Sequence, residues 1–141
     1  MSMFCYQCQE ASKNVGCTVR GVCGKDDATA NQMDVLVYAL KGLAWTAQRK
    51  AQAGESIADE GRFILEALFA TITNANFDIE RIKTLTYETL QRKEKLLGSY
   101  GGGESLPDFV QFRAQNDEDL RAAEERAGVK ATADEDVRSL R

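Results

Sequence analysis

The sequence predicts an all-α protein, a three-helix bundle preceded by a cysteine-rich loop. Apolar residues recur at steps of three and four positions over three long segments, and no segment has the alternating pattern of a strand. All four cysteines lie within the first 23 residues. A chain of 141 residues, 43% of them apolar, is long enough for one domain with a packed core.

Residues 1–26 are expected to form the cysteine-rich loop and residues 27–97 the bundle. Asp26 and Asp27 can cap a first helix that runs to about Gln52. The side chains of this helix that are expected to face the core are Met33, Leu36, Val37, Leu40, Leu43, Ala44 and Ala47.

A second helix is expected from about Asp59 to Thr73, after a break at residues 53–56. Its inward side chains would be Phe63, Ile64, Ala67, Leu68 and Ile72. A turn at residues 74–76 separates it from the third helix.

Asp78 is expected to cap the third helix, which runs to about Leu97. Its apolar side consists of Ile79, Ile82, Leu85, Leu90 and Leu97. The charged run Arg92–Lys95 near its end predicts a solvated last turn.

The remaining residues, 98–141, are expected to complete the same domain. Residues 98–115 form a loop that contains the glycines 101–103. Within residues 116–141, a shorter helix runs from about Asn116 to Ala127, with Gly128 as its stop. The residues Thr132–Glu135 have the form of a capping box that opens a further helix, of which only about two turns are present. The sequence therefore reads as a fragment of a longer protein.

Composition excludes several classes of function. The net charge of −4, without a basic stripe, argues against a nucleic-acid partner. The absence of histidine excludes a histidine acid or base and mixed Cys/His metal sites. No apolar run approaches a membrane span, and the N-terminus lacks the pattern of a signal peptide, so no membrane partner and a cytoplasmic location are expected.

The cysteines Cys5, Cys8, Cys17 and Cys23 are the candidate ligands of a metal centre, with the spacing C-x2-C-x8-C-x5-C. Two disulfides would need an oxidising compartment. Four thiolates suit tetrahedral zinc, but zinc sites usually pair two short knuckles and only the first pair here is short. An iron–sulfur cluster needs thiolates that converge from an irregular loop, and the spacing favours this interpretation over the other two.

Residues around the cysteines have several interpretations. Gly16, Gly21 and Gly24 would let the backbone approach a cluster, or they are ordinary loop glycines. Phe4 and Tyr6 would shield it from water, or they are core residues. The cations Lys13, Arg20 and Lys25 could offset cluster charge, although a solvated position is the simpler interpretation.

Four stretches of the chain together resemble one known family. They are Met3–Glu10 (MFCYQCQE), Gly16–Lys25 (GCTVRGVCGK), Phe69–Asp78 (FATITNANFD) and Glu135–Arg141 (EDVRSLR). The first two closely resemble the opening of the hybrid cluster proteins, also called hydroxylamine reductases, and the other two extend the resemblance to the end of the chain.

The resemblance implies that Cys5, Cys8, Cys17 and Cys23 ligate a cubane 4Fe–4S cluster, because the spacing is that of the cubane class and not of the 2Fe–2S class. Family members are much longer, and their later domains hold a hybrid iron–sulfur–oxygen cluster bound by His, Glu and further Cys. This chain has no His and no fifth Cys, so alone it is not expected to be catalytic.

The function implied is that of an electron-transfer domain within an oxidoreductase that converts hydroxylamine to ammonia. Its partners would be the remainder of the full-length protein and an electron-donor redox protein. The alternative is a helical interaction module without a redox role, whose four-cysteine site holds zinc or nothing.

Overall fold

The structure is a computed structural model that describes residues 3–73, 77–101 and 105–140. Within these residues all regular elements are helical, apart from an isolated bridge between Cys5 and Cys17. The all-α prediction is confirmed. The predicted turn at residues 74–76 and most of the glycine run lie outside the described residues.

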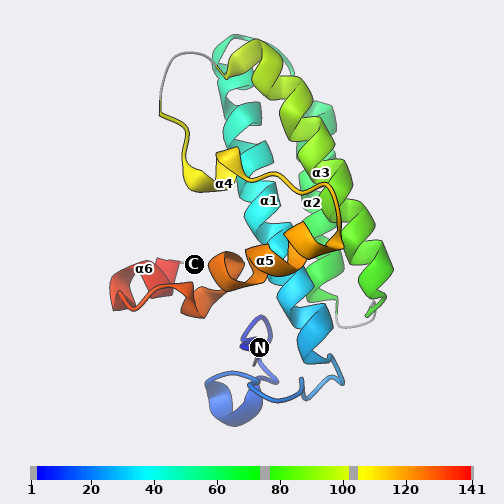
Figure 1. Cartoon of the computed structure of the whole chain (residues 1–141), viewed down its shortest axis with the longest axis vertical. Helices are drawn as coiled ribbons and strands as arrows, with labels where there is room; N and C mark the ends of the chain where they lie inside the picture. Colours follow the sequence, from blue (N-terminus) through cyan, green and yellow to red (C-terminus); the bar gives the residue numbers. More distant parts are fainter. Residues whose placement is uncertain (1–2, 74–76, 102–104, 141) are drawn as a thin grey trace.

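Three long helices, α1 (Asp27–Gln52), α2 (Ala58–Ile72) and α3 (Ile79–Tyr100), form an up-down-up bundle, in which α2 runs antiparallel to both α1 and α3 (Figure 1). Side-chain caps start two of them: Asp26 accepts from the backbone N–H of Thr29, and Asp78 accepts from those of Glu80 and Arg81. The main core between these helices consists of Met33, Leu36, Leu40, Leu43, Ala47, Phe63, Ala67, Ile82, Leu85 and Leu96.

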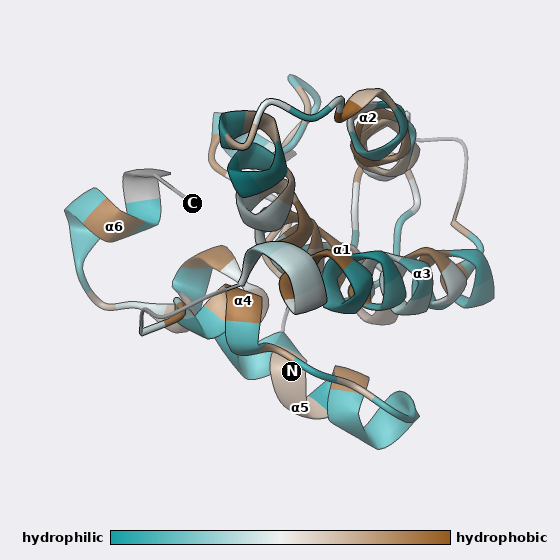
Figure 2. Cartoon of the chain, turned by 90° about the horizontal axis from the view of Figure 1, so that it is seen from above, coloured by the Kyte–Doolittle hydropathy of each residue, from teal (hydrophilic) through white to brown (hydrophobic). Residues whose placement is uncertain are grey.

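Two more helices cover the bundle from the side opposite α2. These are α4 (Asp108–Gln111), inside the segment expected to be a loop, and α5 (Asp117–Ala127), which begins with the Asn116 capping box. Seen from above, α2 lies on one side of α1 and α3, and α4 and α5 lie on the other (Figure 2). A second core forms here from Val35, Tyr38, Ala39, Leu90, Phe112, Leu120, Ala123 and Ala127.

Helix α1 is therefore buried on two faces, while its expected core residue Ala44 is exposed and Val37 is half-buried. Helix α2 also differs from the prediction. Phe63 and Ala67 are buried, but Leu68 and Ile72, expected to face inward, are 38% and 51% exposed. Only one face of α2 packs against the bundle, so the rest of its apolar residues point away from it.

The charged run near the end of α3 is only partly solvated: Glu94 and Lys95 are exposed as expected, but Lys93 is fully buried. Its Nζ donates to the backbone carbonyl of Phe112 and lies 3.5 Å from Oε1 of Glu94. Burial, together with the nearby charge of Arg113, lowers the pKa of Lys93 to about 8. The lysine connects α3 to the segment between α4 and α5. Helix α3 also continues to Tyr100, beyond the expected end at Leu97.

The last helix, α6 (Glu135–Leu140), begins where the sequence indicated, but its cap is Asp134 and not Thr132. The Asp134 carboxylate accepts from the N–H groups of Asp136 and Val137, because it is one residue before the first helical turn. The Thr132 hydroxyl accepts from the N–H of Asp134 instead.

Candidate functional site

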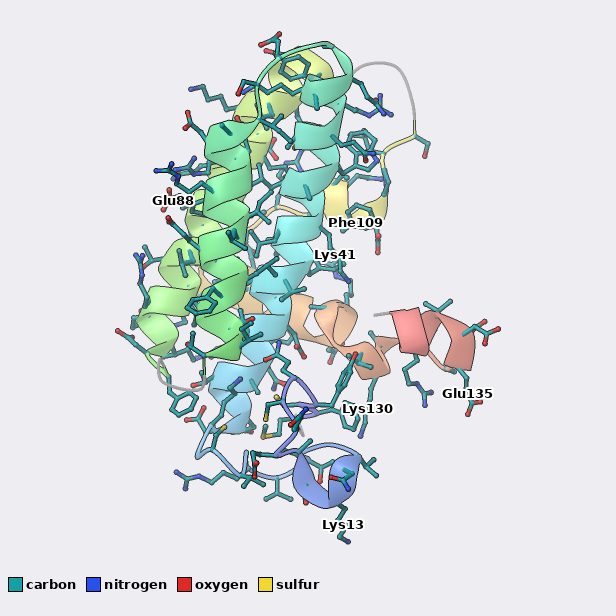
Figure 3. The ribbon with its side chains drawn as sticks, turned by 180° about the vertical axis from the view of Figure 1, so that it is seen from behind. Lys13, Lys41, Glu88, Phe109, Lys130 and Glu135 are labelled. Carbon is teal, nitrogen blue, oxygen red and sulfur yellow. The ribbon has the colours of Figure 1, made fainter. Side chains whose placement is uncertain are left out.

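The cysteine segment, residues 3–25, lies at the end of the bundle where α1 begins (Figures 1 and 3). It is irregular, with one 3₁₀ turn, η1 (Ser12–Asn14). Its two halves are joined where the N–H of Cys5 donates to the Cys17 carbonyl at 3.0 Å and the N–H of Cys17 donates to the Cys5 carbonyl at 2.7 Å. These two bonds place the first and third predicted ligands directly opposite each other.

None of the four cysteines is in a disulfide, and their environments differ. Cys17 is buried, Cys5 and Cys8 are half-buried, and Cys23 is exposed. Across the described residues, no three cysteine, aspartate or glutamate side chains are grouped closely enough to hold a metal ion. The structure thus pairs Cys5 with Cys17 without gathering all four sulfurs into one shell, and the ligand assignment remains a prediction.

Two positions in this segment require glycine, one because of a close contact and one because of its backbone conformation. A Cβ on Gly16 would lie 2.7 Å from the ring of Phe4, so a side chain at this position would displace the ring beside the Cys5–Cys17 bridge. Gly24 has a φ of +94°, a conformation that side chains with a Cβ rarely adopt. It closes a tight turn around Cys23, in which its N–H donates to the Gly21 carbonyl.

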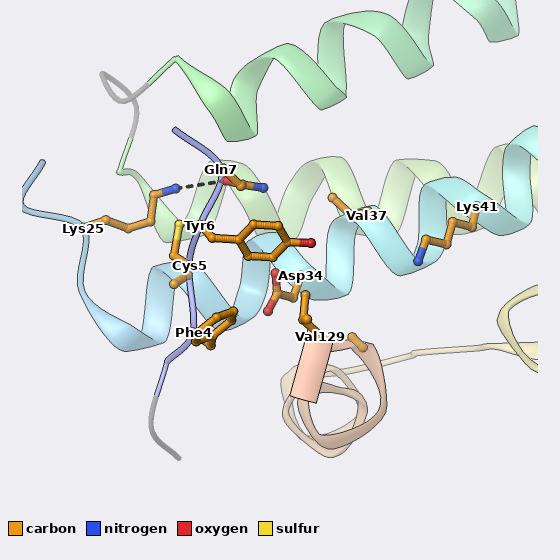
Figure 4. A pocket seen from close by; sticks show the side chains of 11 residues that line it. Phe4, Cys5, Tyr6, Gln7, Lys25, Asp34, Val37, Lys41 and Val129 are labelled. Atoms are coloured by element: carbon orange, nitrogen blue, oxygen red, sulfur yellow. Dashed lines mark hydrogen bonds between the residues drawn. The ribbon is translucent and has the colours of Figure 1, made fainter. Parts of the chain in front are cut away.

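Lys25 ends the segment and is 1% exposed, so the simpler expectation of a solvated lysine is wrong for this residue. Its Nζ donates to the backbone carbonyl of Thr71 at 3.3 Å. It also donates to Oε1 of Gln7 at 3.4 Å (Figure 4). Both acceptors are uncharged. Lys13 and Arg20 are exposed, as expected for solvated cations.

A cavity of about 160 Å³ lies between the cysteine segment and α1 (Figure 4). Cys5, Lys25 and Asp34 are among its lining side chains. Burial raises the pKa of Asp34 to about 6, although the charges of Lys25 and Lys41 oppose this shift. Sequence reasoning missed Asp34; the signal was a carboxylate on the face of α1 next to the buried Met33 and Val35.

The aromatic residues beside the first two cysteines pack differently from each other. The ring centroids of Phe4 and Tyr6 are 5.6 Å apart. Phe4 is half-buried under the Nζ of Lys130, which lies 4.5 Å from its ring centroid, whereas Tyr6 is 44% exposed. Phe4 therefore covers the segment where it meets the 3₁₀ turn η2 (Val129–Ala131), whereas Tyr6 remains largely open to solvent.

None of the helices in the described part of the chain is both long enough and apolar enough to cross a membrane.

Comparison with known proteins gives a consistent result. Residues 3–141 match the Prismane/CO dehydrogenase family. A hydroxylamine reductase of Halothermothrix orenii is 44% identical over the whole of this chain and 27% of its own length. Those of Thermoanaerobacter pseudethanolicus and Clostridium tetani are 43% and 41% identical, again over the whole of this chain and over 26% and 30% of their lengths.

The chain thus spans only about a quarter of the length of these relatives, although they match it from end to end. The family match covers the cysteine segment, the bundle and the last helices together. The resemblance that the sequence motifs indicated is confirmed at the level of the family: the chain belongs to the Prismane/CO dehydrogenase family.

Proposed function

We propose that this chain binds one iron–sulfur cluster through Cys5, Cys8, Cys17 and Cys23 and serves as the electron-transfer domain of a hydroxylamine reductase. The observation that carries the proposal is the state of the cysteines. All four lie outside disulfides, within one irregular segment of a chain whose relatives are named hydroxylamine reductase. We also place the protein in the cytoplasm, where cysteines remain reduced and available as ligands.

The donor set is chemically suited to iron and sulfide, because it consists of thiolates alone in a chain without histidine. Cys5 and Cys17 are already opposite each other through two backbone hydrogen bonds. Cys23 lies exposed on the turn between Gly21 and Gly24, where few contacts oppose a change of its rotamer. Cluster binding would then order this turn, because metal–thiolate bonds couple ligation to folding.

The cubane 4Fe–4S type follows from the resemblance in cysteine spacing. Such a cluster, when bound, takes up and releases one electron at a time. The chain would hold it at the end of the bundle, with the side chain of Phe4 covering part of the segment and the buried Lys25 supplying positive charge. A cluster with four thiolate ligands carries net negative charge, so a buried cation nearby would stabilise its reduced form.

The chemistry at the nitrogen substrate would take place elsewhere in the full-length protein. This chain has no histidine and no cysteine beyond the four ligands. A cluster that is fully ligated by protein thiolates offers no open position for substrate. In this proposal an external redox protein donates electrons to the domain, which passes them to the rest of the enzyme for the reduction of hydroxylamine to ammonia.

Metal analysis of anaerobically purified protein tests the cofactor directly. We expect roughly four iron and four acid-labile sulfide per chain, the composition of one cubane. One zinc per chain without sulfide would overturn the proposal and favour the interaction module. Two iron and two sulfide would retain the electron-transfer role and correct the cluster type.

An anaerobic assay with reduced viologen tests whether this chain transfers electrons without itself reducing hydroxylamine. The cluster-loaded 141-residue chain should accept electrons yet produce no more ammonia from hydroxylamine than free iron and sulfide do. Sustained ammonia production by a sample of confirmed mass would place the substrate site within this chain and contradict the proposal.

A further inference from the structure

Helix α2 has apolar side chains on two opposite faces. Phe63 and Ala67, which are 8% and 0% exposed, pack into the main core with α1 and α3. The opposite side, here called the outer α2 face, consists of Leu65, Leu68, Phe69 and Ile72, which are 69%, 38%, 62% and 51% exposed. A helix with apolar residues all round is usually buried on all sides.

The outer α2 face is a continuous stripe, because its four positions follow steps of three and four along the helix. Ala58 and Gly61 extend the stripe toward the start of α2 without adding a charge. A Cβ on Gly61 would have no neighbour within 4 Å, so another backbone could approach closely there. The nearest charged residues, Arg62 and Glu66, flank the stripe.

The elements that could cover this face lie elsewhere in the part of the chain that the structure describes. Helices α4 and α5 pack on the other side of α1 and α3 (Figure 2). The cysteine segment reaches α2 at its end, where Lys25 donates to the Thr71 carbonyl. Four large apolar side chains on one helix face form a patch of the kind that marks an interaction site.

We propose that the outer α2 face is the docking surface for the remainder of the full-length polypeptide. Relatives 44% and 43% identical to the whole chain have only 27% and 26% of their length matched by it, so most of each polypeptide lies outside this segment. A contact within one polypeptide benefits from a high effective concentration, so a single helix face is sufficient. A specific dimer normally buries about 800 Å² on each partner, a larger surface than four partly exposed side chains of one helix offer.

The docking surface also has a consequence for the position of the cysteine segment. Thr71 and Ile72 end α2, and the bond from Lys25 to Thr71 joins this end to the cysteine segment. A domain that covers the outer α2 face would therefore lie beside that segment. The inference rests on the family and the exposed face, and it holds whether or not the cysteines bind a cluster.

Hydrogen exchange followed by mass spectrometry tests the inference, because it compares the backbone of α2 in two samples. In the full-length protein, the amides of residues 65–72 should exchange at least tenfold more slowly than in the isolated 141-residue chain. The double variant Leu65→Ser/Phe69→Ser should lose this difference. The matched control Arg62→Ser/Glu66→Ser, on the same helix, should keep it.

Two outcomes would overturn the proposal. Equal exchange of residues 65–72 in both wild-type samples would show that the remainder does not cover α2. If the isolated chain sediments as a dimer and the double serine variant as a monomer, the occupant of the face is a second copy of the chain.

Far-UV circular dichroism of each variant must match that of the wild type. Leu65→Ser alone provides a milder variant if the double variant fails to fold. Iron content is measured separately, so that failure of the proposed cofactor does not affect this test.

Discussion

In the bundle, a residue such as Leu36 is fully buried among apolar side chains of three helices. The small buried apolar cluster at the cysteine segment consists of Met3 and Cys17 of the segment and Ala30 of α1, with Cys5 packed against it. Val15, Val19 and Val22 of the segment are exposed. The bundle therefore has an apolar core of its own, whereas the segment depends more on a few hydrogen bonds and, in our proposal, on what its cysteines bind.

The two buried lysines, Lys93 in the bundle and Lys25 in the cysteine segment, also differ in how the protein surrounds their charge. Lys93 lies within the bundle, with a backbone carbonyl as its acceptor and the Glu94 carboxylate 3.5 Å away. Lys25 lies in the cysteine segment and donates to two uncharged acceptors. Lys93 thus has a carboxylate 3.5 Å away, whereas Lys25 shares its cavity with the Asp34 carboxylate and hydrogen-bonds uncharged groups, so the proposed anionic cluster would add to the compensation of its charge.

The largest expected effect is loss of the proposed cluster from the cysteine segment without unfolding of the bundle. Cys17→Ser removes the buried ligand of the proposed cluster, and serine is a poor substitute for a thiolate toward iron. We expect the variant to lose most of its iron and visible absorbance, while far-UV circular dichroism retains most of the helical signal of the bundle. Thr18→Ser is the matched control. A variant that keeps full absorbance would show that Cys17 is not a ligand.

The second prediction concerns the bundle. Leu36→Ala creates a cavity in the main core and should lower the free energy of unfolding by about 2–5 kcal/mol. In the isolated chain, Leu65→Ala on the outer α2 face should change it by less than about 0.5 kcal/mol. Urea unfolding measures both. A loss at Leu65 as large as that at Leu36 would mean that α2 is packed on both faces in the isolated chain.

The third prediction uses pH to examine Lys93. Its pKa is about 8 in the folded state against 10.5 in the unfolded chain, so between these values the unfolded chain binds more protons. The contribution of Lys93 to stability should therefore rise with pH, by on the order of 1–2 kcal/mol between pH 7 and 9.5.

Lys93→Met should remove this rise, and Lys95→Met, at an exposed position in the same turn, should retain it. Urea unfolding of each protein at the two pH values provides the comparison. Identical pH dependence of wild type and Lys93→Met would mean that Lys93 titrates at its ordinary pKa.

The smallest expected effect concerns Lys25 and depends on the proposed cluster. Lys25→Met removes a buried positive charge from the cysteine segment and should lower the midpoint potential of the cluster by tens of millivolts, because the reduced form carries more negative charge. Lys25→Arg and Lys13→Met should leave the potential nearly unchanged. A redox titration followed by electron paramagnetic resonance decides this; equal potentials in all four proteins would contradict a role for Lys25.

Much of this protein was predictable from the sequence, because the signals are local. Helix α1 begins and ends where its caps and apolar periodicity indicated, and α5 ends at Ala127, before the Gly128 that was expected to stop it. The four clustered cysteines identified the candidate site without any structure, and the motifs around them indicated the family. Capping, periodicity and motif spacing each depend on residues within a few positions of one another, so a single sequence contains them.

The tertiary structure decided what depends on distant contacts. Periodicity shows that α2 has apolar residues but not which of its faces meets α1, so Leu68 and Ile72 were placed inward although they point to solvent. Lys93 is buried because the segment after α4 crosses it and supplies the Phe112 carbonyl, 19 positions away. Asp34 has a raised pKa because the cysteine segment and α5 come together beside it, an arrangement that only the packing of separate elements produces.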